Sequence, residues 1–133
     1  MAFLLLEAVH EVEARLEAAV APVGLSLAKF GVLARLAEAG EPVALGCLAD
    51  RCSCVRSNMT QLVDRLESER LVERISDPVD RRSVRAALTR EGEERYAEGA
   101  RALGGVEEEL FAGLGVEDRE TLVRLLHQVG GPE

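Results

Sequence analysis

The sequence is poor in aromatic residues: it has three Phe, one Tyr and no Trp among 133 residues. Its core must therefore come mainly from Leu, Val and Ala, which favours packing between helices. No apolar run approaches the ~20 residues that cross a bilayer. The apolar start at residues 1–20 has no basic leader and soon becomes amphipathic, so we interpret it as a first helix rather than a signal peptide. We expect a cytoplasmic protein without a membrane partner.

Motifs of catalysis are also missing. The sequence contains no evident nucleophile–base pair, no phosphate-binding glycine loop and no HExxH motif. These absences argue against an enzyme, and no metal or cofactor is predicted. A composition of 47% hydrophobic and 30% charged residues is typical of a globular chain. The length predicts a single domain over residues 1–133.

The charge is unevenly distributed. The net charge is −8, which by itself argues against nucleic acid as a partner. Residues 51–90, however, hold nine arginines and six acidic residues, a net +3, whereas the remainder carries −11. Arginine suits contacts to phosphate and guanine, so this segment favours a nucleic-acid interface. A solvated surface with local ion pairs is the alternative.

Hydrophobic periodicity predicts a mainly helical chain with one small hairpin. The expected helices cover about 3–20, 26–39, 44–51, 55–68, 90–112 and 117–129, and the expected strands cover 71–76 and 83–89. Ser26 and Thr89 are predicted helix caps. In the fourth helix, Met59, Val63 and Leu66 form an inward stripe, while the opposite face is polar. A helix–turn–helix followed by a hairpin is a winged helix, with Asp77-Pro78 starting the turn of the wing.

Several motifs within Leu48–Gly92 resemble those of the multiple antibiotic resistance regulator (MarR) family of transcription factors. They are VDRLE at 63–67, LVER at 71–74, DPVDRRS at 77–83 and LTREG at 88–92, which occur in order at fixed spacing. Residues 24–40 also resemble the second helix of the family. The resemblance covers most of the chain and is weakest at its two ends.

The resemblance implies a homodimer that represses nearby genes by binding an inverted-repeat operator in double-stranded DNA, with relief by a small-molecule effector or an oxidant. Residues 26–89 would form the winged helix-turn-helix, and residues 1–22 and 90–133 the flanking dimerisation helices. The implied DNA contacts in the recognition helix are Arg56, Ser57, Asn58, Thr60, Gln61 and Arg65, and those in the wing are Arg81 and Arg82. Asp80 and Arg82 match an Asp-x-Arg pair that would brace the wing, which makes Arg81 the better candidate for the minor groove.

Two positions depart from the family pattern. Arg70 stands where the family usually has Gly, just past the recognition helix. Gly suits a left-handed C-cap, so either the turn differs or Arg70 bears strain, which could place a phosphate contact. Val55 replaces a small polar cap, and Ser53 can start the helix earlier instead. Both departures concern helix boundaries rather than the fold.

Three cysteines, Cys47, Cys52 and Cys54, cluster around the helix–turn–helix. One hypothesis makes them a redox sensor, because oxidation there would move the recognition helix. Core packing of Cys52 and Cys54 is the alternative that we favour, with Cys47 more exposed. The spacing C-x4-C-x-C is not a standard zinc pattern.

The leading hypothesis is a dimeric DNA-binding regulator. A winged helix used for protein contact, without DNA readout, is the alternative, and the acidic net charge gives it weak support. The sequence names neither the operator, the regulated genes nor the effector, and it leaves activation open beside repression.

Overall fold

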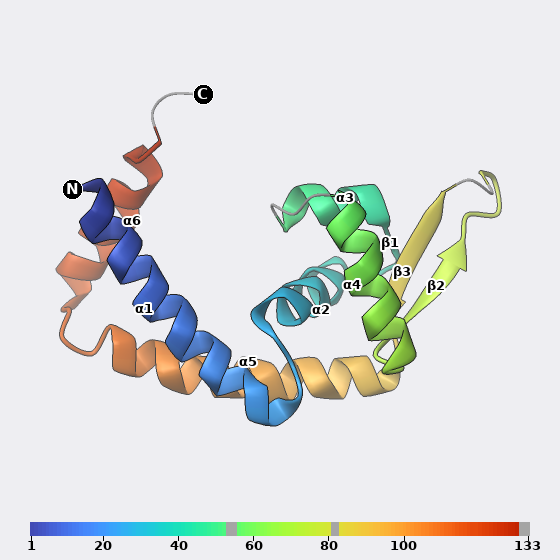
Figure 1. The fold of residues 1–133 in the computed structure, drawn as a ribbon, viewed down its shortest axis with the longest axis horizontal. Helices are drawn as coiled ribbons and strands as arrows, with labels where there is room; N and C mark the ends of the chain where they lie inside the picture. Colours follow the sequence, from blue (N-terminus) through green and yellow to red (C-terminus); the bar gives the residue numbers. More distant parts are fainter. Residues whose placement is uncertain (53–55, 81–82, 131–133) are drawn as a thin grey trace.

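The computed structural model describes residues 1–52, 56–80 and 83–130 (Figure 1). The fold is mainly helical with one small sheet, as the sequence predicts. The elements are α1 (Ala2–Val20), the 3-10 turn η1 (Ala21–Val23), α2 (Leu27–Ala39), β1 (Val43–Ala44), α3 (Leu45–Arg51), α4 (Arg56–Ser68), β2 (Val72–Ser76), β3 (Val84–Leu88), α5 (Arg90–Leu110) and α6 (Val116–Gln128). Their bounds agree with the predicted ones to within one or two residues.

Two regions of the molecule are connected by α5. The winged-helix lobe, defined here as α2, α3, α4 and the sheet, lies on one side, and α6 lies on the other (Figure 1). The first half of α5 passes beneath the lobe and contacts α2 and β3. Because α1 also packs on α5, this helix is the common support of the fold.

The buried core lies within the winged-helix lobe and the end of α1. Its apolar stripe from α4 is the predicted one, because Met59, Val63 and Leu66 are each 0% exposed. The core residues are Val20, Leu25, Val32, Leu33, Leu36, Val43, Leu48, Ala49, Met59, Val63, Leu66, Leu71, Val72 and Ala86. Helix α4 is therefore anchored to the core through the buried side chains of Met59, Val63 and Leu66.

The sheet has three strands in the order β1-β3-β2, all antiparallel. The predicted hairpin of β2 and β3 is confirmed, and a third strand that was not predicted joins it, because Val43 pairs with Ala86 and Ala44 with Arg85. A two-residue strand carries no periodic pattern that could reveal it in the sequence. Strand β1, which lies between α2 and α3 in the sequence, is thereby hydrogen-bonded to the central strand β3.

The junction between the sheet and α5 is closely packed. Thr89 Oγ1 accepts a hydrogen bond from the Gly92 backbone N–H at 3.0 Å, which confirms the predicted cap, and donates one to the Arg70 carbonyl at 2.6 Å. A Cβ on Gly92 would lie 2.0 Å from the Leu71 carbonyl oxygen. Only glycine fits this position without displacement of the backbone. Ser26 caps α2 in the same way, accepting from the Lys29 N–H at 3.1 Å.

No single helix in residues 1–52, 56–80 and 83–130 has both the length and the apolarity needed to cross a bilayer. The bent pair Ala2–Val23 and Leu27–Ala39 passes that test only when its two helices, at 76° to each other, are taken together.

Candidate nucleic-acid interface

The outer face of α4 is polar and solvent-exposed. Asn58, Thr60, Gln61 and Arg65 are all exposed, opposite the buried stripe. Arg56 and Ser57 begin the helix, and their side chains lie outside the described part of the structure. Four of the six predicted recognition-helix residues therefore share one accessible face, with hydrogen-bonding groups suited to base edges and phosphates.

The C-terminal end of α4 closes in a Schellman turn. Arg70 has φ 64°, the one left-handed non-glycine residue in the described chain. Its backbone N–H donates to the Glu67 carbonyl, and that of Leu71 donates to the Leu66 carbonyl, both at 2.9 Å. This pattern is the one that a C-terminal glycine normally completes. Arg70 thus keeps the family-like turn and bears the strain that its Cβ causes.

Replacing Arg70 by glycine is expected to raise the free energy of unfolding by up to about 1 kcal/mol, because the left-handed conformation then lacks the Cβ clash. Urea denaturation measures the change. Arg70→Ala, which removes the charge and keeps Cβ, is the control and should leave stability within about 0.5 kcal/mol of wild type. A glycine variant no more stable than the alanine variant would mean that the turn is unstrained.

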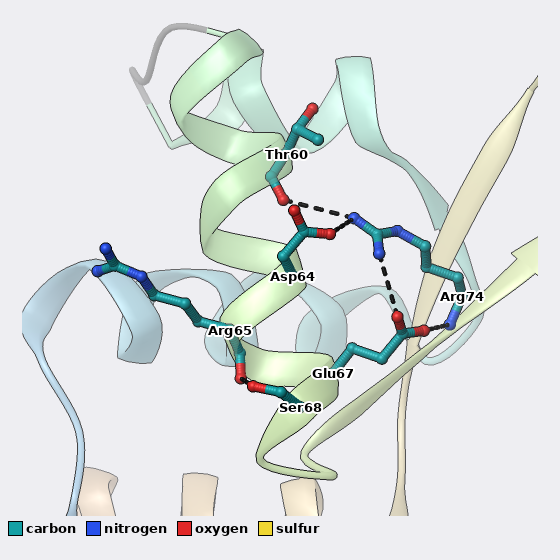
Figure 2. A network of polar contacts seen from close by, with 6 residues as sticks. All are labelled: Thr60, Asp64, Arg65, Glu67, Ser68 and Arg74. Carbon is teal, nitrogen blue, oxygen red and sulfur yellow. Dashed lines mark hydrogen bonds and ion pairs between the residues drawn. The ribbon is translucent and has the colours of Figure 1, made fainter.

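A network centred on Arg74 of β2 ties α4 to the wing (Figure 2). Its guanidinium donates to Glu67 Oε1 at 3.0 Å, to the Thr60 carbonyl at 3.4 Å and to the Asp64 carboxylate. Its backbone N–H donates to Glu67 Oε2 at 3.1 Å. One arginine therefore fixes the rotation of α4 relative to the sheet at three successive turns of the helix.

This network also shapes the electrostatics of α4. The hydrogen bond with Asp64 is the main cause that raises the pKa of Arg74 above its ordinary value, and the charges of Asp64 and Glu67 add to it. Two carboxylates that would repel a phosphate backbone are thereby paired with a permanent cation. The Arg65 side chain points to the other side of the helix from Arg74 (Figure 2). Sequence reasoning did not single out Arg74, because its partners come from another element.

The turn that leads into the wing tip is organised by Asp77. Its Oδ1 accepts hydrogen bonds from the backbone N–H groups of Val79 and Asp80 at 2.9 and 3.4 Å. Its Oδ2 accepts one from Arg85 of β3 at 3.2 Å. The bond from Val79 is the largest cause that lowers the pKa of Asp77 below its ordinary value of 3.8. The predicted role of Asp77 as turn starter is confirmed, and its partner Arg85 is new.

Replacing Asp77 by alanine is expected to weaken DNA binding about three- to tenfold, because the wing tip loses its side-chain acceptor. Anisotropy with an operator duplex measures this effect. Asp77→Asn keeps an acceptor for the two N–H groups and should retain most of the affinity. Because ionised Asp77 has a lowered pKa, its contribution to the turn persists at neutral pH and is lost only as the pH falls below 3.8. Equal losses in both variants would contradict this role.

The remaining predicted residues are only partly described. Arg81, Arg82 and Cys54 lie outside the described residues, so the Asp80–Arg82 brace stays a prediction. Cys47 is exposed, and Cys52 is half-buried against the core. In the described ranges, no group of three or more His, Cys, Asp or Glu side chains is placed to hold a metal ion.

Comparison with known proteins gives related sequences that are transcriptional regulators of the helix-turn-helix type. A model described as MarR family matches residues 23–83. The uncharacterized HTH-type regulator YkoM of Bacillus subtilis (strain 168) is 32% identical over 108 residues, which span 80% of this chain and 69% of YkoM. YsmB of the same organism, also an uncharacterized HTH-type regulator, is 42% identical over 65 residues, 49% of this chain and 44% of YsmB. The match thus spans less than half of YsmB.

Solved structures resemble almost the whole chain. A mutant MarR from E. coli complexed with operator DNA has a TM-score of 0.89 at 25% identity, covering 97% of this chain and 92% of its own. The transcriptional repressor CouR bound to a 23-mer DNA duplex has a TM-score of 0.90 at 29% identity. The match covers 97% of this chain and 91% of the CouR chain. BpsR of Bordetella bronchiseptica, a protein whose DNA binding is regulated by 6-hydroxynicotinic acid, has a TM-score of 0.86 at 25% identity. The match covers 96% of each chain. The fold is thus that of transcription regulators rather than of an enzyme, and this chain belongs to the MarR family of helix-turn-helix regulators.

Proposed function

We propose that this protein is a homodimeric transcriptional repressor that binds an inverted-repeat operator in double-stranded DNA. In each protomer α4 enters the major groove, and the wing carries Arg81 and Arg82 to the adjacent minor groove, with Arg82 also bracing the wing. The observation that carries the proposal is the exposed polar face of α4, whose two acidic neighbours, Asp64 and Glu67, are already paired with Arg74. The DNA complexes of MarR and CouR support it.

Dimerisation is proposed through the terminal apolar surface, which comprises exposed large apolar side chains of α1 and α6. Phe3 is 81% exposed and Val116 is 74% exposed. The surface comprises Phe3, Leu4, Leu5, Leu6, Val9, Val116, Val123, Leu125 and Leu126. A soluble monomer rarely exposes so many large apolar side chains on two helices, so a second copy is the cover that we propose. Residues 1–22 and 90–133 then form the dimerisation part and residues 26–89 the DNA-binding part.

Two such protomers would present their α4 helices about 34–36 Å apart, one turn of DNA, and so match a pseudo-palindrome. We further propose that the protein acts in the cytoplasm and that a small molecule or an oxidant relieves repression. The regulation of BpsR by 6-hydroxynicotinic acid supports relief by a small molecule. For relief by an oxidant, Cys47 is the more exposed of the two described cysteine thiols.

Selection of duplexes from a random pool, followed by sedimentation of the complex, tests the proposal. We expect an inverted repeat to be enriched and two chains to bind each duplex. The Ser57→Ala and Gln61→Ala variants should lose the preference for the selected sequence. Failure to enrich any sequence at low salt would contradict DNA readout and favour the protein-contact alternative, and one chain per duplex would contradict the dimer.

A further inference from the structure

The exposed side of α4 carries three residues at positions i, i+3 and i+7, which we call the free stripe: Asn58, Gln61 and Arg65. Gln61 is two positions from each of the buried residues Met59 and Val63, so it lies about 160° from both, at the centre of the exposed face. Within the described ranges, the three side chains of the free stripe make no hydrogen bond or ion pair with the protein. They are therefore available to an external partner.

The acidic groups of α4 lie on a different side of the helix. Both of its acidic residues, Asp64 and Glu67, accept hydrogen bonds from the guanidinium of Arg74. The Arg65 side chain points away from this network (Figure 2). The free stripe thus presents two amides and a guanidinium. A carboxylate is the group that accepts from the N4 amino group of cytosine, and the stripe offers none.

A side-chain amide carries a carbonyl acceptor and an NH₂ donor next to each other. In the major groove, adenine presents the N6 amino donor beside the N7 acceptor, so one amide can make two hydrogen bonds to it. Guanine presents two acceptors, which leaves the amide carbonyl without a donor. Cytosine and thymine each present a single hydrogen-bonding group there. Adenine is therefore the base that matches Asn58 and Gln61 best.

The spacing of the two amides fits neighbouring base pairs. Three residues of α-helix rise about 4.5 Å, whereas successive base pairs rise about 3.4 Å. A recognition helix in the major groove therefore brings the two amides to bases one or two steps apart. We propose that Asn58 and Gln61 are specificity-determining residues that each bind the N6 and N7 edge of one adenine. Each operator half-site then contains two A·T pairs one or two steps apart. This inference rests on the proposed function, because α4 must enter the major groove.

Replacement of single atoms in a selected operator duplex tests the two contacts. 7-Deazaadenine lacks the N7 acceptor in the major groove and still pairs with thymine. Placed at either adenine in both half-sites, it should weaken wild-type binding at least about fivefold in an anisotropy titration. The matched control is 3-deazaadenine at the same position, which lacks an acceptor in the minor groove instead. It should leave the affinity within about twofold of the unmodified duplex.

Alanine variants assign each amide to its adenine. In Gln61→Ala, 7-deazaadenine at the base bound by Gln61 should cause no further loss, because the contact is already absent. At the base bound by Asn58, it should cause the same loss as in wild type. Asn58→Ala should show the reverse pattern. Both side chains are exposed, so the variants should fold, and thermal unfolding checks this.

Exchange of an amide for a carboxylate should change the base that is read. Gln61→Glu and Asn58→Asp nearly keep the shape of the side chain, but an ionised carboxylate only accepts hydrogen bonds. Each variant should therefore select cytosine in place of adenine at one position of the half-site. A selection experiment with a random pool of duplexes, run beside wild type, measures the change.

Three results would overturn the inference and leave the proposed function standing. They are selected half-sites without two A·T pairs at this spacing, equal effects of 7-deazaadenine and 3-deazaadenine, and carboxylate variants that select the same bases as wild type. Failure of the wild-type protein to enrich any duplex at low salt would overturn both the proposed function and this inference.

Discussion

Replacing Arg74 by alanine is expected to weaken operator binding by about tenfold to 100-fold, a larger effect than removing one phosphate contact. The guanidinium makes hydrogen bonds to Asp64, Glu67 and the Thr60 carbonyl. Its loss releases the rotation of α4 relative to the wing and removes the positive charge beside two carboxylates, although Glu67 still accepts from the backbone N–H of residue 74. Fluorescence anisotropy with a selected duplex measures the affinity, and urea denaturation should show a loss of about 1–2 kcal/mol.

Two further variants separate positioning from charge. Arg74→Lys keeps the positive charge but lacks the planar fork that spans Asp64 and Glu67, so it should recover only part of the affinity. Adding Asp64→Asn to the Arg74→Ala variant removes one carboxylate that has lost its partner, so the double variant should bind the operator several-fold more tightly than Arg74→Ala alone. If Arg74→Ala binds the operator as tightly as wild type, the network has no role in placing α4.

Replacing Gly92 by alanine is expected to destabilise the protein by about 3 kcal/mol, at the upper end of overpacking effects. The new Cβ would lie 2.0 Å from the Leu71 carbonyl oxygen and 3.1 Å from Leu88 Cδ2, so backbone must move. The junction of the wing with α5 would open, and the Thr89 cap would lose its geometry. Thermal unfolding should shift down by roughly 10 °C.

Gly105→Ala is the matched control on the same helix. A Cβ on Gly105 would meet no atom within 4 Å in the described chain, so alanine should stabilise α5 by up to about 1 kcal/mol. Opposite signs for the two substitutions would show that close approach, rather than helix propensity, requires glycine at position 92. A stable Gly92→Ala protein would contradict the packing described for this junction.

Local features were predictable from the sequence because their causes are local. The caps at Ser26 and Thr89 depend on residues three positions away, and both occur as expected. The inward stripe of α4 follows from helical spacing alone. For Arg70 the comparison with the family pattern left two possibilities, a different turn or a strained left-handed residue, and its φ of 64° corresponds to the second. The turn at Asp77 likewise depends on neighbours within three residues.

Features that join distant segments were not predictable. Strand β1 exists because Val43 meets Ala86, and a two-residue strand leaves no pattern to detect. Arg74 meets Asp64 only after β2 has folded back along α4, so its spacing in the sequence reveals nothing. Strand β1 and the contact of Arg74 with Asp64 both depend on tertiary contacts between distant segments, rather than on the secondary-structure preferences of neighbouring residues.

The proposed function requires that the exposed face of α4 reads operator DNA. Anisotropy of the selected duplex across a salt series tests it most directly, with Arg65→Ala compared against Arg101→Ala, which removes an exposed arginine of α5. We expect wild-type dissociation constants on the order of 10⁻⁸ M or tighter, and we expect the affinity to fall steeply as the salt concentration rises. Arg65→Ala should weaken binding at least about tenfold and Arg101→Ala should not. Equal affinity for selected and scrambled duplexes, or equal effects of the two substitutions, would contradict it.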